Sequence, residues 1–328
     1  MPENYELHLV ALSDLESEDL RNREYDLALF ASGYETRCTF VASQFEQLNA
    51  ERIVVLGFAN EEGNLDRRDN HDNWWRMSRG TEPEVLSPDD PTQIYELLNR
   101  HLPLSLDTPR VLVDYSSMSR VWYSAVMTWA RFAERASVEI DFVYAPGAYQ
   151  LEAQGGEYPA LVVRGMETVP GFDGLIEQDK EDAAICSLGL DWWQPWAVME
   201  NMAPDRALAV WGVHNDAVAE RAASVNEDFL KSYVAAEDRY PVRLASVANT
   251  YRLLAELSAG MLTRWNVAFV GMGPKPIGLA GLLVGCELPA VSCIRVHGAP
   301  PSSHDVQPDG TIIATHVEFG PARPDRRA

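Results

Sequence analysis

Short, β-branched apolar runs alternate with helical patterns along this chain, and that alternation constrains the fold more than any other feature. In the first half the apolar runs are Tyr25–Ser32, Arg52–Phe58, Arg110–Ser116 and Val138–Pro146. Runs of this length and composition are typical of strands that are buried on both faces of a sheet. Apolar residues at helical spacing occupy the intervening segments Thr36–Asn49, Asp90–Leu102 and Arg120–Ala136. This order predicts a doubly wound, mainly parallel sheet.

The second half continues in the same style, without a strict sequence repeat. Its expected strands are Arg206–His214, Val242–Asn249, Asn266–Met272, Val291–Gly298 and Thr311–Phe319. Its expected helices are Asp216–Val234, Thr250–Leu262 and Pro276–Glu287. We therefore predict an α/β protein with two Rossmann-like, doubly wound, mainly parallel sheets that are related by architecture rather than by sequence.

Domain boundaries are predicted from composition. Residues 1–168 are expected to form an N-terminal domain and residues 191–320 a C-terminal domain. Residues 169–190 are interpreted as a connector, because they combine proline, glycines and an acidic stretch. We expect the tryptophans of Asp191–Trp196 to pack in a core or between the halves, with a ligand contact as the alternative, and the tail 321–328 to be disordered.

Composition excludes several classes of protein. The net charge of −22, from 27 basic and 49 acidic residues, argues against broad nucleic-acid binding, but it allows a local positive pocket for a phosphate group. No apolar run reaches the roughly 18 residues of a membrane span. Met1–Ser13 lacks the basic start of a secretory signal. Four scattered cysteines without a CxxC pair predict reduced thiols and a cytoplasmic location.

Two strand-to-helix junctions of the first half carry candidate ligand-binding residues, because ligands of open α/β sheets bind where strands end and helices begin. The first junction supplies Ser32, Gly33 and Arg37. The second, "DYSSMSR", supplies Ser116, Ser117, Ser119 and Arg120 after Asp114. Hydroxyls, backbone N–H groups and arginine suit phosphate or ribose oxygens. The alternatives are a tight turn with Arg37 paired to Glu35, and a serine that only caps a helix.

In the second half, "GMGPKP" offers Gly271, Gly273 and Lys275 at another such junction. Glycines permit close backbone approach, and a lysine at a helix start suits an anion, although the pattern is neither a Walker A loop nor GxGxxG. The alternative is a rigid turn with a solvated lysine. His214, at the end of a predicted strand, is a candidate general base or ribose contact.

The segment Glu61–Arg76 is interpreted as a charged, mobile lid followed by two tryptophans. It contains an "HD" pair, His71–Asp72, of the kind found in metal phosphohydrolases. No second histidine pair at helical spacing accompanies it, so no metal site is expected. The sequence predicts no specific cofactor, and a bound nucleotide is the one candidate.

At "DYSSMSR", inside the predicted β-α-β-α-β order, the first half resembles the CRISPR-associated Rossmann-fold (CARF) sensor family and related defence-island proteins. The resemblance spans about Tyr25–Tyr149, and the family pattern of a strand-end Asp, a hydroxyl-containing loop and a basic residue before a helix falls on Asp114, Ser116, Ser117, Ser119 and Arg120. In this loop the family usually has two adjacent glycines, whereas this chain has serines and Met118 there. The resemblance implies binding of a nucleotide second messenger across a pair of such folds, with the second half as an intramolecular partner.

Three functions are carried forward. The first is a cytoplasmic sensor or regulatory protein that binds a nucleotide-like molecule, in a prokaryotic defence system. The second is a nucleotide-processing enzyme, a hydrolase or glycosyl transferase, with Asp114, His214 or Glu35 as proton-transfer groups. The third is an acidic assembly subunit that docks a protein partner or forms a homo-oligomer. A membrane partner is not expected.

Overall fold

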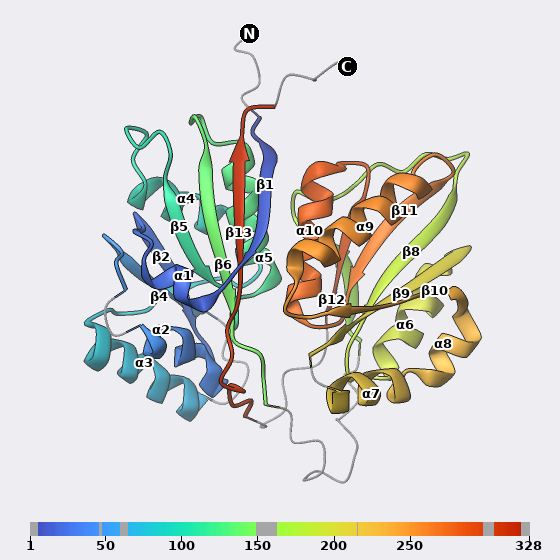
Figure 1. The fold of residues 1–328 in the computed structure, drawn as a ribbon, viewed down its shortest axis with the longest axis horizontal. Coiled ribbons are helices and arrows are strands. Elements are labelled where there is room, and N and C mark those ends of the chain that lie inside the picture. The colour runs from blue at the N-terminus through green and yellow to red at the C-terminus, as the bar shows by residue number, and fades with distance from the viewer. Residues whose placement is uncertain are drawn as a thin grey trace. The chain divides into compact units, whose positions relative to one another are not determined.

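The computed structural model describes residues 6–45, 48–59, 65–148, 163–214, 216–297 and 305–322. The chain divides into two compact units. Unit 1 comprises Met1–Ala148 and Ser303–Ala328, and unit 2 comprises Tyr149–Ser302. Each unit contains one mostly parallel sheet interleaved with helices (Figure 1). The predicted α/β fold with two Rossmann-like sheets is therefore confirmed.

In unit 1 the described residues form a seven-stranded sheet with the order β1-β13-β6-β5-β2-β3-β4. Its strands are β1 (His8–Leu15), β2 (Leu27–Ser32), β3 (Ile53–Phe58), β4 (Glu84–Leu86), β5 (Arg110–Asp114), β6 (Val138–Tyr144) and β13 (Ile313–Gly320). The strands from β6 to β4 are parallel to one another. Strand β13 pairs antiparallel with both of its neighbours, β6 and β1. The chain runs outward from β2 through β3 to β4, then returns to β5 on the other side. The order therefore reverses between β2 and β5, as in a Rossmann fold.

Helices cover both faces of this sheet. They are α1 (Ser17–Arg21), the 3-10 turn η1 (Thr36–Thr39), α2 (Phe40–Gln44), α3 (Leu65–Arg79), α4 (Pro91–His101) and α5 (Arg120–Arg131). On one face Trp75 of α3 packs against Phe30, with ring centroids 5.0 Å apart. On the other face Trp122 of α5 packs against Phe58 at 4.5 Å. Side chains of adjacent strand positions point to opposite faces, so two helical layers enclose the apolar strands.

Unit 2 repeats the strand order. Its described strands are β7 (Gly165–Thr168), β8 (Glu181–Leu188), β9 (Arg206–Val213), β10 (Val234–Arg243), β11 (Trp265–Gly271) and β12 (Ser292–His297). They lie in the order β10-β9-β8-β11-β12-β7, and all pairs are parallel except β12 with β7. The chain again runs outward from β8 to β10 and returns to β11. The order reverses between β8 and β11, so β8 corresponds to β2 and β11 to β5.

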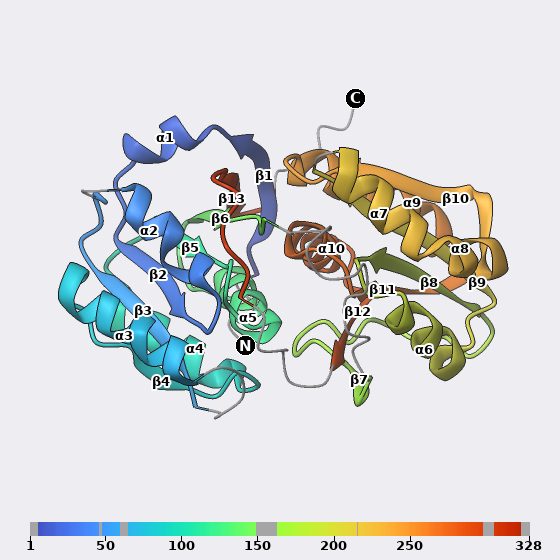
Figure 2. The ribbon, with the colours of Figure 1, turned by 90° about the horizontal axis from the view of Figure 1, so that it is seen from below.

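The helices of unit 2 also lie on two faces (Figure 2). They are α6 (Trp193–Met202), α7 (Asp216–Val225), α8 (Glu227–Tyr233), α9 (Val247–Met261) and α10 (Lys275–Glu287). Helices α6 and α8 pack on the face that carries Cys186 and Val270. Helix α10 packs on the opposite face, where Gly281 lies against the ring of Phe269. This helix is buried along nearly its whole length, which matches its apolar sequence.

The predicted domain boundaries are wrong in two places. The expected connector 169–190 contains β8, the central strand of unit 2. The first two residues of β8 are exposed acids. For this reason the buried stretch Ala183–Leu188 that follows them was not recognised as a strand. The expected C-terminal domain 191–320 included β13, which instead pairs with β1 and β6 of unit 1. Unit 2 is thus inserted between β6 and β13, a long-range pairing that no local pattern reveals.

Two elements also differ from expectation. Residues 65–76 of the expected lid lie in helix α3 (Leu65–Arg79), in which the buried positions are His71 and Trp75, and residues 61–64 lie outside the described residues. This buried stripe is so narrow that the charged residues dominate the sequence pattern. The expected strand at 242–249 is instead the end of β10, followed by the start of α9. As an edge strand, β10 has many exposed polar positions and therefore lacks an apolar run.

None of the helices in the described ranges is long and apolar enough to cross a membrane. Residues 323–328 of the expected disordered tail lie outside the described residues.

Candidate functional site

In unit 1 the predicted loops meet where the strand order reverses. β2 and β5 are neighbouring parallel strands, so the loops that follow them leave the same edge of the sheet. A Cβ atom at Gly33 would lie 3.2 Å from Cβ and 3.4 Å from Oγ of Ser117. The turn after β2 therefore packs directly against the serine loop, and only glycine fits there without displacing it. The structure thus brings the candidate loop of Ser32 and Gly33 against the candidate loop of Ser116 and Ser117, and ligand binding by them stays a prediction.

The serines of this loop have different surroundings. Asp114 accepts hydrogen bonds from the Ser116 amide (3.0 Å) and hydroxyl (2.5 Å), and Ser116 Oγ accepts one from the Ala145 amide at 2.7 Å. Ser119 caps α5 by accepting from the Trp122 amide at 3.2 Å. Ser117 Oγ is enclosed and has no hydrogen-bond partner among the described residues. It is thus the hydroxyl of this loop that the fold leaves unsatisfied.

Arg37 is held by the protein. Its side chain is buried, Nε donates to Glu35 at 2.6 Å, and Nη1 donates to the Tyr144 hydroxyl at 2.8 Å. The pairing of Arg37 with Glu35, which the sequence left as an alternative, is therefore present. These contacts join the loop after β2 to the end of β6. Arg120 is the first residue of α5, on the other side of the same strand ends, and is half-buried.

Helix α3 contributes two residues that sequence reasoning did not assign to this site. Asp72 accepts a hydrogen bond from Ser32 Oγ at 2.5 Å, and His71 Nδ1 donates to the Gly33 carbonyl at 2.7 Å. Both contacts fix the turn that faces Ser117. One feature of the sequence could have revealed this helix: His71 and Trp75 are four residues apart, a spacing that places both on one face of a helix.

The chain after unit 2 returns to this loop. Asp305 accepts hydrogen bonds from the Thr36 amide at 2.8 Å and hydroxyl at 2.6 Å, and it lies 3.6 Å from Arg67. Burial would raise the pKa of Asp305, but the Thr36 hydrogen bonds and the Arg67 charge outweigh it and hold the pKa below its ordinary value. The ionised carboxylate thereby anchors the start of η1.

The equivalent edge of unit 2 lies between β8 and β11. Ser187 Oγ, at the end of β8, accepts hydrogen bonds from the amides of Met272 and Gly273, each at 2.9 Å. A Cβ at Gly273 would lie 2.5 Å from the Leu188 carbonyl oxygen, so this position requires glycine. The two amides are engaged within the protein, and Lys275 begins α10 two residues further on. Gly271 is the last residue of β11.

The candidate proton-transfer groups are spread over both units. His214 directly follows β9 in unit 2, whereas Asp114 and Glu35 belong to unit 1. Within unit 1, Asp114 is engaged by Ser116 and Glu35 by Arg37. In the described ranges no three His, Cys, Asp and Glu side chains are grouped as a metal site.

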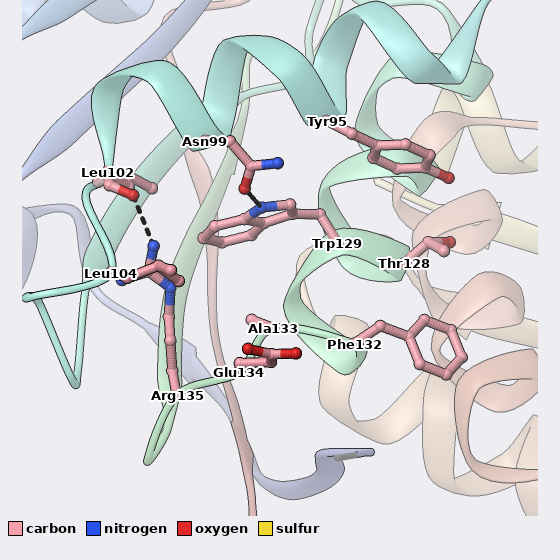
Figure 3. A pocket seen from close by; sticks show the side chains of 10 residues that line it. All are labelled: Tyr95, Asn99, Leu102, Leu104, Thr128, Trp129, Phe132, Ala133, Glu134 and Arg135. Carbon is pink, nitrogen blue, oxygen red and sulfur yellow. Dashed lines mark hydrogen bonds between the residues drawn. The ribbon is translucent and has the colours of Figure 1, made fainter. Parts of the chain in front are cut away.

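A cavity of about 500 Å³ opens at a different place in unit 1 (Figure 3). It lies between the C-terminal parts of α4 and α5, with Trp129 and Phe132 among its walls. Trp129 donates its indole N–H to Asn99 at 2.8 Å, and Arg135 is held by the Leu102 carbonyl at 2.5 Å. These helix ends lie toward the amino ends of the strands, so the cavity is separate from the Gly33–Ser117 contact.

No protein-family model matches the chain, and no curated protein sequence matches it. Among solved structures, one that is similar to it is described as the crystal structure of the cytoplasmic domain of a prokaryotic cation chloride cotransporter. The two chains are 8% identical, and the alignment covers 86% of this chain and 98% of the other with a TM-score of 0.24. A likeness at this TM-score carries no conclusion about fold or function.

Proposed function

We propose that this protein binds a nucleotide or another phosphorylated ligand at the carboxyl edges of its sheets, and acts as a sensor or regulatory protein. The observation that carries the proposal is Ser117, whose enclosed hydroxyl has no partner in the described chain at the point where the β2 and β5 loops meet. An enclosed hydroxyl without a partner is costly, and a ligand oxygen would satisfy it. Open α/β sheets bind ligands at this position.

The repetition of the strand order supports the proposal further. Arg120 begins α5 after β5, and Lys275 begins α10 after the corresponding strand β11. Each unit thus has one cation at a helix start beside its reversal point, in a chain whose net charge is −22. A cation at a helix N-terminus favours an anionic group, because the helix dipole adds to its charge.

The protein is proposed to work in a reducing cytoplasm. All four cysteines are free and buried, and burial raises the pKa of the Cys186 thiol to about 12. Such thiols stay protonated and unreactive near neutral pH. The resemblance to the CARF family adds cyclic oligonucleotides to the ligands proposed, together with a role in defence and a protein partner.

Calorimetric titration of the full chain with ATP and with cyclic di-AMP tests the proposal. We expect saturable binding by the wild type, and about tenfold weaker binding by Ser117→Ala, because one hydrogen bond to a charged group is lost. Thr315→Val is the matched control, since it also removes a buried hydroxyl that has no partner in the described chain, but within β13. Equal affinities of the wild type and Ser117→Ala, or no binding of either probe, would contradict the assignment.

A further inference from the structure

Two exposed tryptophans stand at the carboxyl edge of the unit 2 sheet. Trp192 and Trp193 follow β8 at the start of α6 and are 44% and 40% exposed. Their ring centroids are 5.4 Å apart with an interplanar angle of 75°, an edge-to-face arrangement. Trp196, one turn further, packs against Tyr233 at 5.2 Å. Trp196 therefore packs inside unit 2, as expected for this segment, whereas Trp192 and Trp193 are exposed.

The backbone fixes the position of the pair. Asp191 accepts hydrogen bonds from the Trp193 amide at 2.9 Å and the Gln194 amide at 3.4 Å, so it caps α6. The cap engages the amides at this helix start and places a negative charge beside the rings. A phosphate group is disfavoured there by charge repulsion, whereas a neutral planar ring is not. The pair is therefore suited to an aromatic group rather than to an anion.

The pair and Lys275 flank the same strand ends. Gly189, just after β8, packs on the turn after β11: a Cβ at Gly189 would lie 3.5 Å from the Gly273 Cα. Helix α6, which carries the tryptophans, covers the face of the sheet with Cys186 and Val270. Helix α10, which begins at Lys275, covers the opposite face. The point where the strand order reverses is thus bordered by aromatic rings from one side and by a cation from the other.

We propose that Trp192 and Trp193 stack on the base of a nucleotide whose phosphate lies toward Lys275. This inference rests on the proposed function and narrows its ligand class to nucleotides with an accessible base. Contiguous exposed apolar patches, rather than single exposed side chains, mark interaction sites, and the two indoles are adjacent. A base stacked on an aromatic side chain gains affinity by about 5- to 150-fold.

The test compares ATP and cyclic di-AMP with inorganic triphosphate, by calorimetry on the full chain. The variants are Trp192→Ala/Trp193→Ala, the conservative Trp192→Phe/Trp193→Phe, and Ile176→Ala. Ile176 is 75% exposed and precedes β8, so it controls for loss of exposed apolar surface at the other end of that strand. We expect the double alanine variant to bind the nucleotides at least tenfold more weakly and triphosphate within twofold of the wild type. The phenylalanine variant keeps most of the nucleotide affinity, and Ile176→Ala keeps all of it.

The outcomes separate this inference from the proposed function. If the wild type binds nucleotides and the double alanine variant binds them equally well, the stacking role is overturned and the proposed function stands. An equal loss for nucleotides and triphosphate also overturns it, because the rings then act on the fold or on the phosphate site. If the wild type binds neither nucleotide, the proposed function fails together with this inference. Circular dichroism of each variant shows whether it is folded.

Discussion

At the scale of single residues, two adjacent serines of the β5–α5 loop have opposite relations to the fold. Ser116 is fully buried and joins Asp114 to the Ala145 amide, so it holds the loop in place. Ser117 packs on Gly33 and has a hydroxyl that no described residue satisfies. One serine is engaged by the fold, and the other has a hydroxyl that the described chain leaves unsatisfied.

This difference predicts different stabilities. Ser116→Ala should lower the free energy of unfolding by about 1–3 kcal/mol, because it leaves the buried Ala145 amide without its acceptor and removes the hydroxyl hydrogen bond to Asp114. Ser117→Ala should leave the free energy of unfolding unchanged, or raise it by up to about 1 kcal/mol, because it removes an unsatisfied hydroxyl. Urea unfolding followed by circular dichroism measures both. Similar losses in the two variants would show that Ser117 is as engaged as its neighbour.

The glycine of the unit 2 turn gives a second prediction. Gly273→Ala should lower the free energy of unfolding by about 1–3 kcal/mol, because its Cβ would meet the Leu188 carbonyl and the backbone must shift. Gly260→Ala is the control: it lies in α9 with nothing within 4 Å of its Cβ, and should raise the free energy by about 0.5–1 kcal/mol. Thermal unfolding of both variants checks the sign, and a neutral Gly273→Ala would refute the close approach.

At the scale of elements, the sequence predicted most of those with a wide buried surface, with β8 as an exception, and missed those with a narrow one. The strands β2, β3, β5 and β6 and the helices α4 and α5 lie close to where they were expected. Helix α3 was missed because its buried residues are few, and with it the contacts of His71 and Asp72 to the β2 turn. Most of β10 was missed for the same reason, because few of its residues are buried. The positions of the loops at the strand ends were predictable, but the partners of each side chain were not.

The Asp305 anchor predicts a pH dependence. Asp305→Ala should lower the free energy of unfolding by about 1–2 kcal/mol at pH 7, since it removes two hydrogen bonds to a carboxylate. The pKa of Asp305 is lowered by folding, so its contribution is present above the ordinary carboxyl pKa and is lost as the pH falls through the lower, folded value. Urea unfolding at pH 7 and pH 3 should show a smaller difference between variant and wild type at pH 3. A difference that grows on acidification would contradict this.

At the scale of the whole molecule, one Rossmann-like unit is inserted into another. The sequence indicated two α/β sheets, but it placed β13 with unit 2 because that strand follows β12 along the chain. The pairing of β13 between β1 and β6 joins residues more than 150 positions apart, and only tertiary structure establishes such a contact.

The insertion predicts which fragments fold. Residues 149–302 alone should unfold cooperatively. Residues 1–148 alone should not, because β1 and β6 lose the strand between them. Joining residue 148 directly to residue 303 should restore a folded unit 1, since Ala148 N already donates to the Gln307 carbonyl at 2.8 Å. Thermal melts of the three fragments decide this, and a cooperative melt of 1–148 would count against the role of β13.

Hydrogen-exchange mass spectrometry of the full chain, with and without saturating ATP or cyclic di-AMP, tests the central claim most directly. The account predicts slower exchange in the peptides that contain Ser32–Arg37 and Ser116–Arg120, and no change at the α4–α5 cavity around Trp129. Slower exchange confined to that cavity, or unchanged exchange throughout the two loops, would contradict a ligand site at the carboxyl ends of β2 and β5.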